Sequence, residues 1–176
     1  MKDLEKVLVD FEKMLSGLGE KGILSYWIFG EYEEAGIYWK LAETAEKLGL
    51  PASLVGTFRD LAKESEEHGD TLKQIYVRTY GEEPQKVDLP YIEAEVLAKA
   101  LEDPENMPYV LKIAMETELV ARRLYERLAE ITGDESARKV YRYLADVEWT
   151  HYLRLKGEAG LLGITVEVPE AEIAQY

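Results

Sequence analysis

The chain has 176 residues, of which 47% are hydrophobic and 32% are charged, so it predicts one soluble globular domain rather than a disordered segment. Its formal net charge of −14 argues against binding nucleic acid or an anionic membrane through broad electrostatics. The absence of cysteine excludes disulfides, zinc fingers, iron–sulfur clusters and cysteine nucleophiles. Any bound metal must therefore use histidine and carboxylate ligands.

Apolar residues recur at helical spacing almost throughout the chain, and no hairpin pattern interrupts them. A short amphipathic helix is predicted within residues 1–19 and ends at the glycines there. Two long helices follow, over residues 22–48 and 52–80, and Gly49-Leu50-Pro51 separates them. Residues 22–80 are therefore expected to form a first helical hairpin.

A polar connection over residues 81–107 follows, with a short helix expected over 91–102. Two further long helices are predicted over residues 108–132 and 135–160, and they form a second hairpin. Because the connection is long, the second hairpin can pack against the first as a four-helix bundle with a crossover.

The last segment, residues 161–176, alternates polar and apolar residues like an extended strand. This tail and the amphipathic N-terminal helix exceed what a four-helix bundle needs. We therefore expect a homo-oligomer, with a dimer favoured. The charged N-terminus lacks the apolar run of a signal peptide and no apolar stretch is long enough to span a bilayer, so a cytoplasmic location is expected.

The second hairpin repeats a set of residues from the first. The glutamate, tyrosine and alanine of one long helix recur at an offset of 87 residues, and the histidine of the next recurs at an offset of 83. The chain contains only two histidines, and they occupy matching places. The paired positions are Glu31 and Glu118, Tyr38 and Tyr125, Ala42 and Ala129, and His68 and His151.

The two glutamates and two histidines of these pairs, together with Glu148, are candidate metal ligands on apolar helix faces. Glu148 lies three residues before His151, so the two point to the same side of one helix. Taken singly, a buried Glu is more often paired with Lys or Arg, and a buried His is more often hydrogen-bonded in a core. Together, several carboxylates and imidazoles at one depth are costly unless a metal ion neutralises them. Oxygen and imidazole ligands suit iron, manganese or zinc. The five are Glu31, His68, Glu118, Glu148 and His151.

This pattern resembles the ferritin-like superfamily, and most closely its rubrerythrin branch. The resemblance covers about residues 22–160 and implies an all-α, ferritin-like four-helix bundle with a long crossover, forming one domain over residues 1–176. It implies two iron ions, held by one Glu from each of the first and third helices and a Glu-x-x-His from each of the other two. Tyr38 and Tyr125 would then hydrogen-bond the ligand carboxylates.

The chain departs from the family pattern at three points. Ser65 stands where the second helix should carry its Glu, so it is expected beside the ligands, as Tyr38 and Tyr125 are, and Glu64 is the nearest substitute ligand. Ala121 stands where many rubrerythrins have an additional Glu. The rubredoxin domain that supplies electrons in full-length rubrerythrins is absent from this sequence. These differences leave three alternatives: a single-metal site, an asymmetric pair that recruits Glu64, or a degenerate site.

Two functions follow from the resemblance. In the first, a pair of ferrous ions reduces hydrogen peroxide or dioxygen, or is itself oxidised, in defence against oxidative stress. An external electron donor restores the iron, Glu31 and Glu118 are terminal ligands, and Glu148 is the bridge. In the second, the protein is a non-enzymatic metal-binding or structural protein, an alternative that Ser65 motivates.

Overall fold

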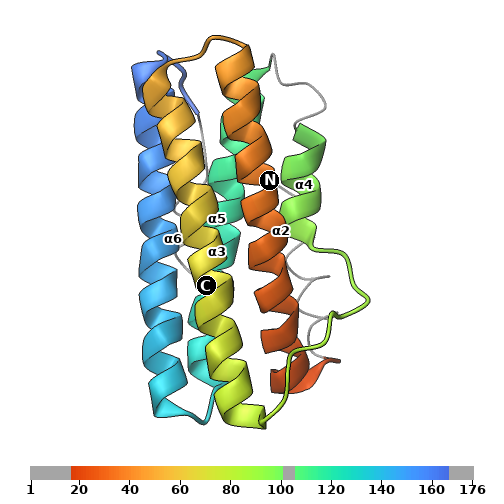
Figure 1. The fold of residues 1–176 in the computed structure, drawn as a ribbon. Coiled ribbons are helices and arrows are strands. Elements are labelled where there is room, and N and C mark those ends of the chain that lie inside the picture. Colours follow the sequence, from red (N-terminus) through yellow and green to blue (C-terminus); the bar gives the residue numbers. More distant parts are fainter. Residues whose placement is uncertain (1–16, 101–105, 167–176) are drawn as a thin grey trace.

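The computed structural model describes residues 17–100 and 106–166, and within these ranges the protein is helical and contains no β-strand. This confirms the predicted all-α fold (Figure 1). The helices are α2 (Gly19–Lys47), α3 (Ala52–Tyr80), α4 (Ile92–Ala100), α5 (Met107–Ile131) and α6 (Glu135–Leu161). The predicted N-terminal helix lies outside the described residues, as does most of the predicted extended tail.

One predicted boundary is wrong. Gly19 was expected to end the N-terminal helix, but it is the first residue of α2. Its backbone has a φ of +66°, a left-handed conformation that glycine adopts without steric cost, so the chain turns at Gly19 and enters α2 directly. The other predicted ends of the long helices agree with the structure to within one residue.

The four long helices form two hairpins, with α2 packed mainly on α3 and α5 packed mainly on α6 (Figure 1). The connection after α3 returns along the α2 side of the bundle, where α4 packs against both α2 and α5. The crossover therefore brings the start of α5 back to the end of the bundle opposite the end of α3, and it sets the two hairpins side by side.

Local capping fixes where the second hairpin turns. The Asp134 carboxylate accepts hydrogen bonds from the backbone N–H groups of Ser136 and Ala137 at the start of α6. The Arg138 guanidinium donates to the carbonyl oxygens of Ala129 and Thr132 at the end of α5, which satisfies acceptors that the helix leaves free. These bonds hold the turn between the two helices that carry Glu118, Glu148 and His151.

A close contact between α2 and α3 lies next to His68. A Cβ atom at Gly69 would lie 2.7 Å from the ring of Tyr32, so only glycine allows the two helices to approach this closely. The Tyr32 hydroxyl also donates a 2.7 Å hydrogen bond to Asp70. The first hairpin is thus tightly packed at the level of its histidine.

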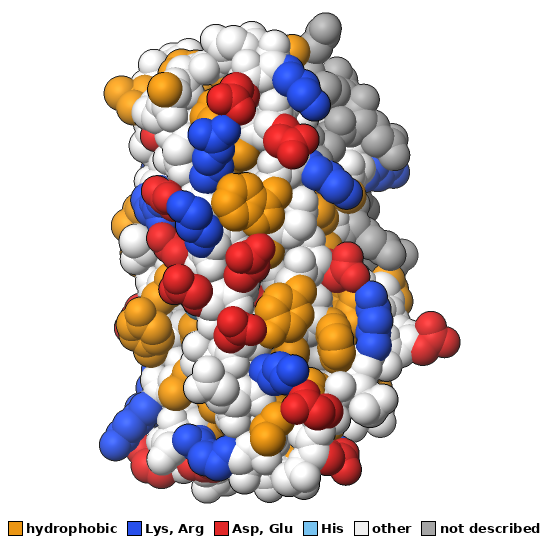
Figure 2. Space-filling model, viewed as in Figure 1, with side chains coloured by type: hydrophobic (Ala, Val, Ile, Leu, Met, Phe, Trp, Pro, Cys, Tyr) orange, Lys and Arg blue, Asp and Glu red, His pale blue; other side chains and the backbone are white. Residues whose placement is uncertain are grey.

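The surface is mixed in charge despite the net negative total. Figure 2 shows Asp and Glu side chains interspersed with Lys and Arg on the face viewed there. Exposed ion pairs among the described residues include Lys86 with Glu33 at 2.8 Å. Among the described residues, no helix combines the length and the apolar character that crossing a membrane requires.

Candidate metal centre

The structure brings the five candidate ligands together in the interior of the bundle. Each of the four long helices contributes at least one of them, and all five are buried. They form two groups of three whose ligand atoms lie within 4.8 Å of one another. One group is Glu31, His68 and Glu148, and the other is Glu118, Glu148 and His151.

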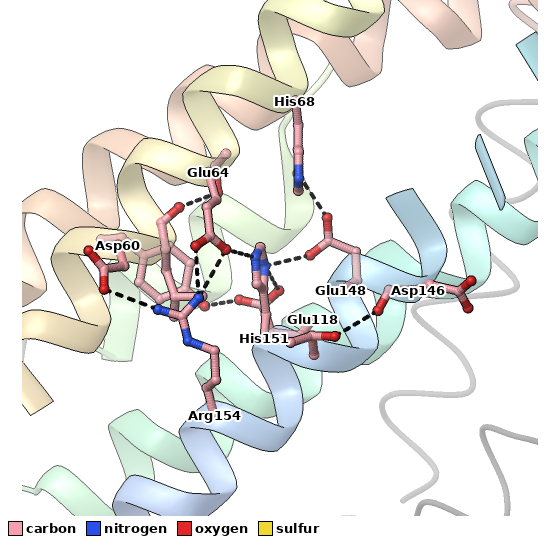
Figure 3. Close-up of polar contacts among 12 residues, drawn as sticks. Asp60, Glu64, His68, Glu118, Asp146, Glu148, His151 and Arg154 are labelled. Atoms are coloured by element: carbon pink, nitrogen blue, oxygen red, sulfur yellow. Dashed lines mark hydrogen bonds and ion pairs between the residues drawn. The ribbon is translucent and has the colours of Figure 1, made fainter. Parts of the chain in front are cut away.

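Glu148 belongs to both groups and lies between the two histidines (Figure 3). Its Oε1 is 3.1 Å from Nδ1 of His68, and its Oε2 is 3.0 Å from Nδ1 of His151. The imidazole rings are nearly parallel, with their centroids 5.6 Å apart. One carboxylate therefore faces two nitrogen ligands on opposite sides, which is the arrangement of a bridging ligand.

The two tyrosines bind the carboxylates of the opposite hairpin. The Tyr38 hydroxyl on α2 donates to Oε1 of Glu118 on α5, and the Tyr125 hydroxyl on α5 donates to Oε1 of Glu31 on α2. In each carboxylate one oxygen is engaged by a phenol and the other, Oε2, faces a histidine. These two crossed hydrogen bonds orient both glutamates and link the hairpins through the core.

Burial disfavours the charged forms of the side chains in this cluster, and their pKa values shift as a result. Burial raises the pKa of Glu31 and raises that of Glu118 to about 8. Burial alone would lower the pKa of His68, but the neighbouring carboxylates of Glu148 and Glu31 outweigh it and raise the value to about 10. Burial alone would raise the pKa of Glu148, but the two neighbouring histidines outweigh burial and hold this pKa well below its ordinary value.

The cluster fits a bound cation better than it fits a hydrogen-bonded core. Three convergent buried atoms have no hydrogen-bond partner among the described residues: Glu31 Oε2, His68 Nδ1 and Glu148 Oε1. His68 lies close to both carboxylates, yet neither contact has the alignment of a hydrogen bond. Buried polar atoms are rarely left in this state, and a divalent ion bound by oxygen and imidazole would satisfy all three.

Ser65 is hydrogen-bonded within its own helix. Its side chain is buried, and its hydroxyl donates a 3.0 Å hydrogen bond to the carbonyl oxygen of Leu61 on the same helix. This bond turns the hydroxyl back along α3. The first hairpin therefore offers Glu31 and His68 where the second offers Glu118, Glu148 and His151.

Glu64 lies outside both ligand groups and contacts the outer face of His151. Its Oε2 is 2.6 Å from Nε2 of His151, the ring nitrogen that faces away from Glu148. Arg154 donates from one guanidinium nitrogen to both oxygens of Glu64, at 2.9 Å each. The hydrogen bond with His151, together with the nearby positive charges, lowers the pKa of Glu64 to about 2, so its carboxylate stays ionised.

Two residues near the centre were not anticipated from the sequence. Arg154, three residues after His151, completes the contact with Glu64. Glu34, three residues after Glu31, is buried, and its negative charge contributes to the raised pKa values of Tyr38 and Tyr125. In both cases the spacing of one helical turn from a candidate ligand was the available signal.

Comparison with known proteins agrees with this geometry. The rubrerythrin family model matches residues 22–159, which include all five candidate ligands. The chain belongs to the rubrerythrin family. A hypothetical protein from Pyrococcus furiosus has the same fold, with a TM-score of 0.66 and 21% sequence identity over 89% of this chain and 98% of that one. No curated protein matches the chain.

Proposed function

We propose that this protein binds two iron ions between its four long helices and reduces hydrogen peroxide with electrons from a separate donor. Two observations support the proposal: the chain belongs to a family that typically binds iron, and it has two groups of buried ligands that share Glu148. Glu148 carries the most weight, because a carboxylate facing a histidine on each side suits a pair of metals. Manganese or zinc suits the same ligands, but zinc has no redox chemistry.

In this proposal Glu31 and His68 hold one ion, Glu118 and His151 hold the other, and Glu148 contacts both. A ferrous pair, when bound, supplies the two electrons that peroxide reduction requires. Overall, hydrogen peroxide takes up two electrons and two protons and yields two water molecules. The donor that restores the electrons is a separate one-electron reductant. Dioxygen reduction or iron oxidation in oxidative-stress defence would use the same residues.

The protein's own side chains organise the site in two ways. Tyr38 and Tyr125 stay protonated, since burial first and the nearby carboxylates next raise the pKa values of their hydroxyls well above the ordinary range. Each phenol therefore keeps its hydrogen bond to one glutamate oxygen and leaves the other oxygen for metal. The burial of the cluster favours an oxidant as small as peroxide or dioxygen.

A second candidate function is non-enzymatic metal binding, and Ser65 favours it. In the family pattern its position carries a carboxylate, and here its hydroxyl is bonded to its own helix. With only one shared carboxylate, the cluster could hold a single ion in one of its two groups. Such a protein would bind metal without two-electron chemistry.

Metal content and turnover measured on the same sample distinguish these functions. The protein is stripped with a chelator, loaded with ferrous iron without oxygen, and assayed for peroxide consumption with excess reductant. About two irons per chain and iron-dependent turnover are expected from the diiron centre. Zinc-loaded protein is the matched control, because it fills the same ligands without redox activity. Binding of one metal, or turnover no faster than with zinc, would contradict the peroxide-reducing function.

A further inference from the structure

The contact between Glu64 and His151 makes the two halves of the metal centre unequal. A neutral imidazole carries one N–H, and a metal can bind only the nitrogen that lacks it. Nδ1 of His151 faces Glu118 and Glu148 at 3.3 and 3.0 Å, so this nitrogen must carry the free lone pair when metal is bound. The proton then belongs on Nε2, where Glu64 lies 2.6 Å away as an acceptor.

Arg154 makes Glu64 a fixed partner rather than a mobile one. The Glu64 side chain is 36% exposed, and a glutamate in that position would otherwise sample several rotamers in water. Arg154 binds both of its carboxylate oxygens, and Asp60 in turn contacts the same guanidinium at 3.4 Å (Figure 3). A series of polar contacts thus leads from the surface to the buried ligand His151, which is 1% exposed. It passes from Asp60 through Arg154 and Glu64.

The equivalent positions around His68 carry no charged residue. At the offset of 83 residues that relates the two histidines, Glu64 corresponds to Val147 and Arg154 corresponds to Thr71. Neither valine nor threonine can supply an ionised acceptor to an imidazole N–H. The two positions that supply Glu64 and Arg154 to His151 therefore carry Val147 and Thr71 in the copy related to His68.

We propose that Glu64, held by Arg154, is a positioning residue that fixes His151 in its metal-binding tautomer, so that the ion at Glu118, Glu148 and His151 binds more tightly than the ion at Glu31, His68 and Glu148. Carboxylate partners of metal-bound histidines fix the ring orientation and raise the basicity of the ligand nitrogen, and their loss typically costs about 10–100-fold in metal affinity. The inference rests on the proposed two-metal centre, but it does not depend on peroxide turnover.

The two histidines make a direct test feasible. Protein labelled with ¹⁵N in histidine has only four ring nitrogens to resolve. Zinc ion is the probe, since it binds the same ligands and is diamagnetic. In the unaltered protein the first equivalent of zinc should shift Nδ1 of His151 and leave a slowly exchanging proton on Nε2, and the second should shift His68. The variant His68→Gln assigns the signals.

Three variants test the role of Glu64. Glu64→Leu should lose the slowly exchanging Nε2 proton, weaken the first zinc site by about 10–100-fold, and remove the preference for His151. Glu64→Gln keeps an acceptor oxygen and should retain part of the preference. Glu66→Gln is the control, because it makes the same change on the same helix at a residue bonded to Trp39 and not to His151.

Each outcome decides between the inference and the proposed function. If the unaltered protein fills His68 first or fills both sites equally, or if Glu64→Leu behaves like Glu66→Gln, the inference is wrong even if peroxide turnover is observed. If His151 fills first and Glu64→Leu removes the preference, the inference holds even if turnover is absent. If no zinc binds, both fail.

Discussion

The α2–α3 hairpin contributes two of the buried ligand side chains, whereas the α5–α6 hairpin contributes three. Both hairpins keep a glutamate, a tyrosine and a histidine at matching positions, and each tyrosine binds the glutamate of the other hairpin. They differ at Ser65, which corresponds to Glu148, and at Glu64, which corresponds to Val147. A duplicated fold can thus remain symmetric in its packing while its two copies diverge in the polar side chains that they place around a shared cluster.

Replacing Glu148 should have the largest effect, because it is the residue that both halves share. Glu148→Ala removes a ligand from each group at once. We expect both metals to be lost, with affinity falling by more than the roughly 100-fold seen when an outer partner of a ligand is removed. Metal analysis of dialysed protein checks this. Glu130→Ala, an exposed site paired with Arg127, is the control. Retention of one tightly bound metal in Glu148→Ala would show that the halves do not depend on a common bridge.

Restoring the missing carboxylate should make the halves more alike. Ser65→Glu adds a further buried carboxylate, so we expect the metal-free protein to melt at a lower temperature and the iron-loaded protein to bind metal more tightly. Calorimetry with and without iron measures both effects. Ser65→Ala is the control, since it removes only a hydroxyl bonded to the Leu61 carbonyl. An unchanged iron affinity in Ser65→Glu would mean that this position does not face the metals.

The two tyrosines offer a matched pair of smaller changes. Tyr125→Phe leaves Oε1 of Glu31 without its donor, and Tyr38→Phe does the same to Glu118. Each should lower the free energy of unfolding by about 1–3 kcal/mol, because a buried acceptor loses its partner. Tyr125→Phe should mainly weaken the metal bound by His68, and Tyr38→Phe the metal bound by His151. Chemical denaturation and zinc titration measure these effects, and exposed Tyr143→Phe is the control. Identical titrations for the two variants would contradict the crossed pairing.

The stability of the metal-free protein should depend on pH in a direction set by the cluster. The pKa of His68 is raised to about 10, so its stabilising contribution is complete below its unfolded value near 6.5 and is lost as the pH rises through 10. Glu118, whose pKa is raised to about 8, favours folding while protonated, and this contribution is lost between about pH 4.5 and 8. The metal-free melting temperature should therefore fall from pH 6 to 9.

Bound metal should reduce this pH dependence, because it holds the carboxylates ionised and the imidazoles neutral. Melting curves at several pH values, with and without zinc, check the prediction. A metal-free melting temperature that rises between pH 6 and 9 would contradict the electrostatic description of the cluster.

The fold was largely predictable because it depends on patterns that one helix carries by itself. Apolar spacing and the Gly-Leu-Pro break after α2 indicated the long helices and their ends. The spacing also suggested the cluster of candidate ligands, since Glu148 and His151, three residues apart, must share a helix face.

The difference between the two halves at Glu64 and Arg154 could not be predicted, because it depends on contacts between helices far apart in the sequence. Spacing indicates which side of α3 carries Glu64, but not that its carboxylate reaches His151, 87 residues away. Arg154 lies one helical turn after His151, but that spacing alone does not indicate that it binds Glu64. Similarly, the sequence suggested that the tyrosines bind ligand carboxylates, but only packing shows that each one reaches across to the other hairpin.

Diffraction measured at the iron edge, on crystals of the iron-loaded protein, tests the central claim most directly because it counts the metals and locates them. We expect two anomalous peaks on either side of Glu148, one near Nδ1 of His68 and one near Nδ1 of His151, with higher occupancy at His151 when iron is limiting. A single peak, a peak coordinated by Glu64, or no peak within the cluster would contradict a two-metal centre bridged by Glu148.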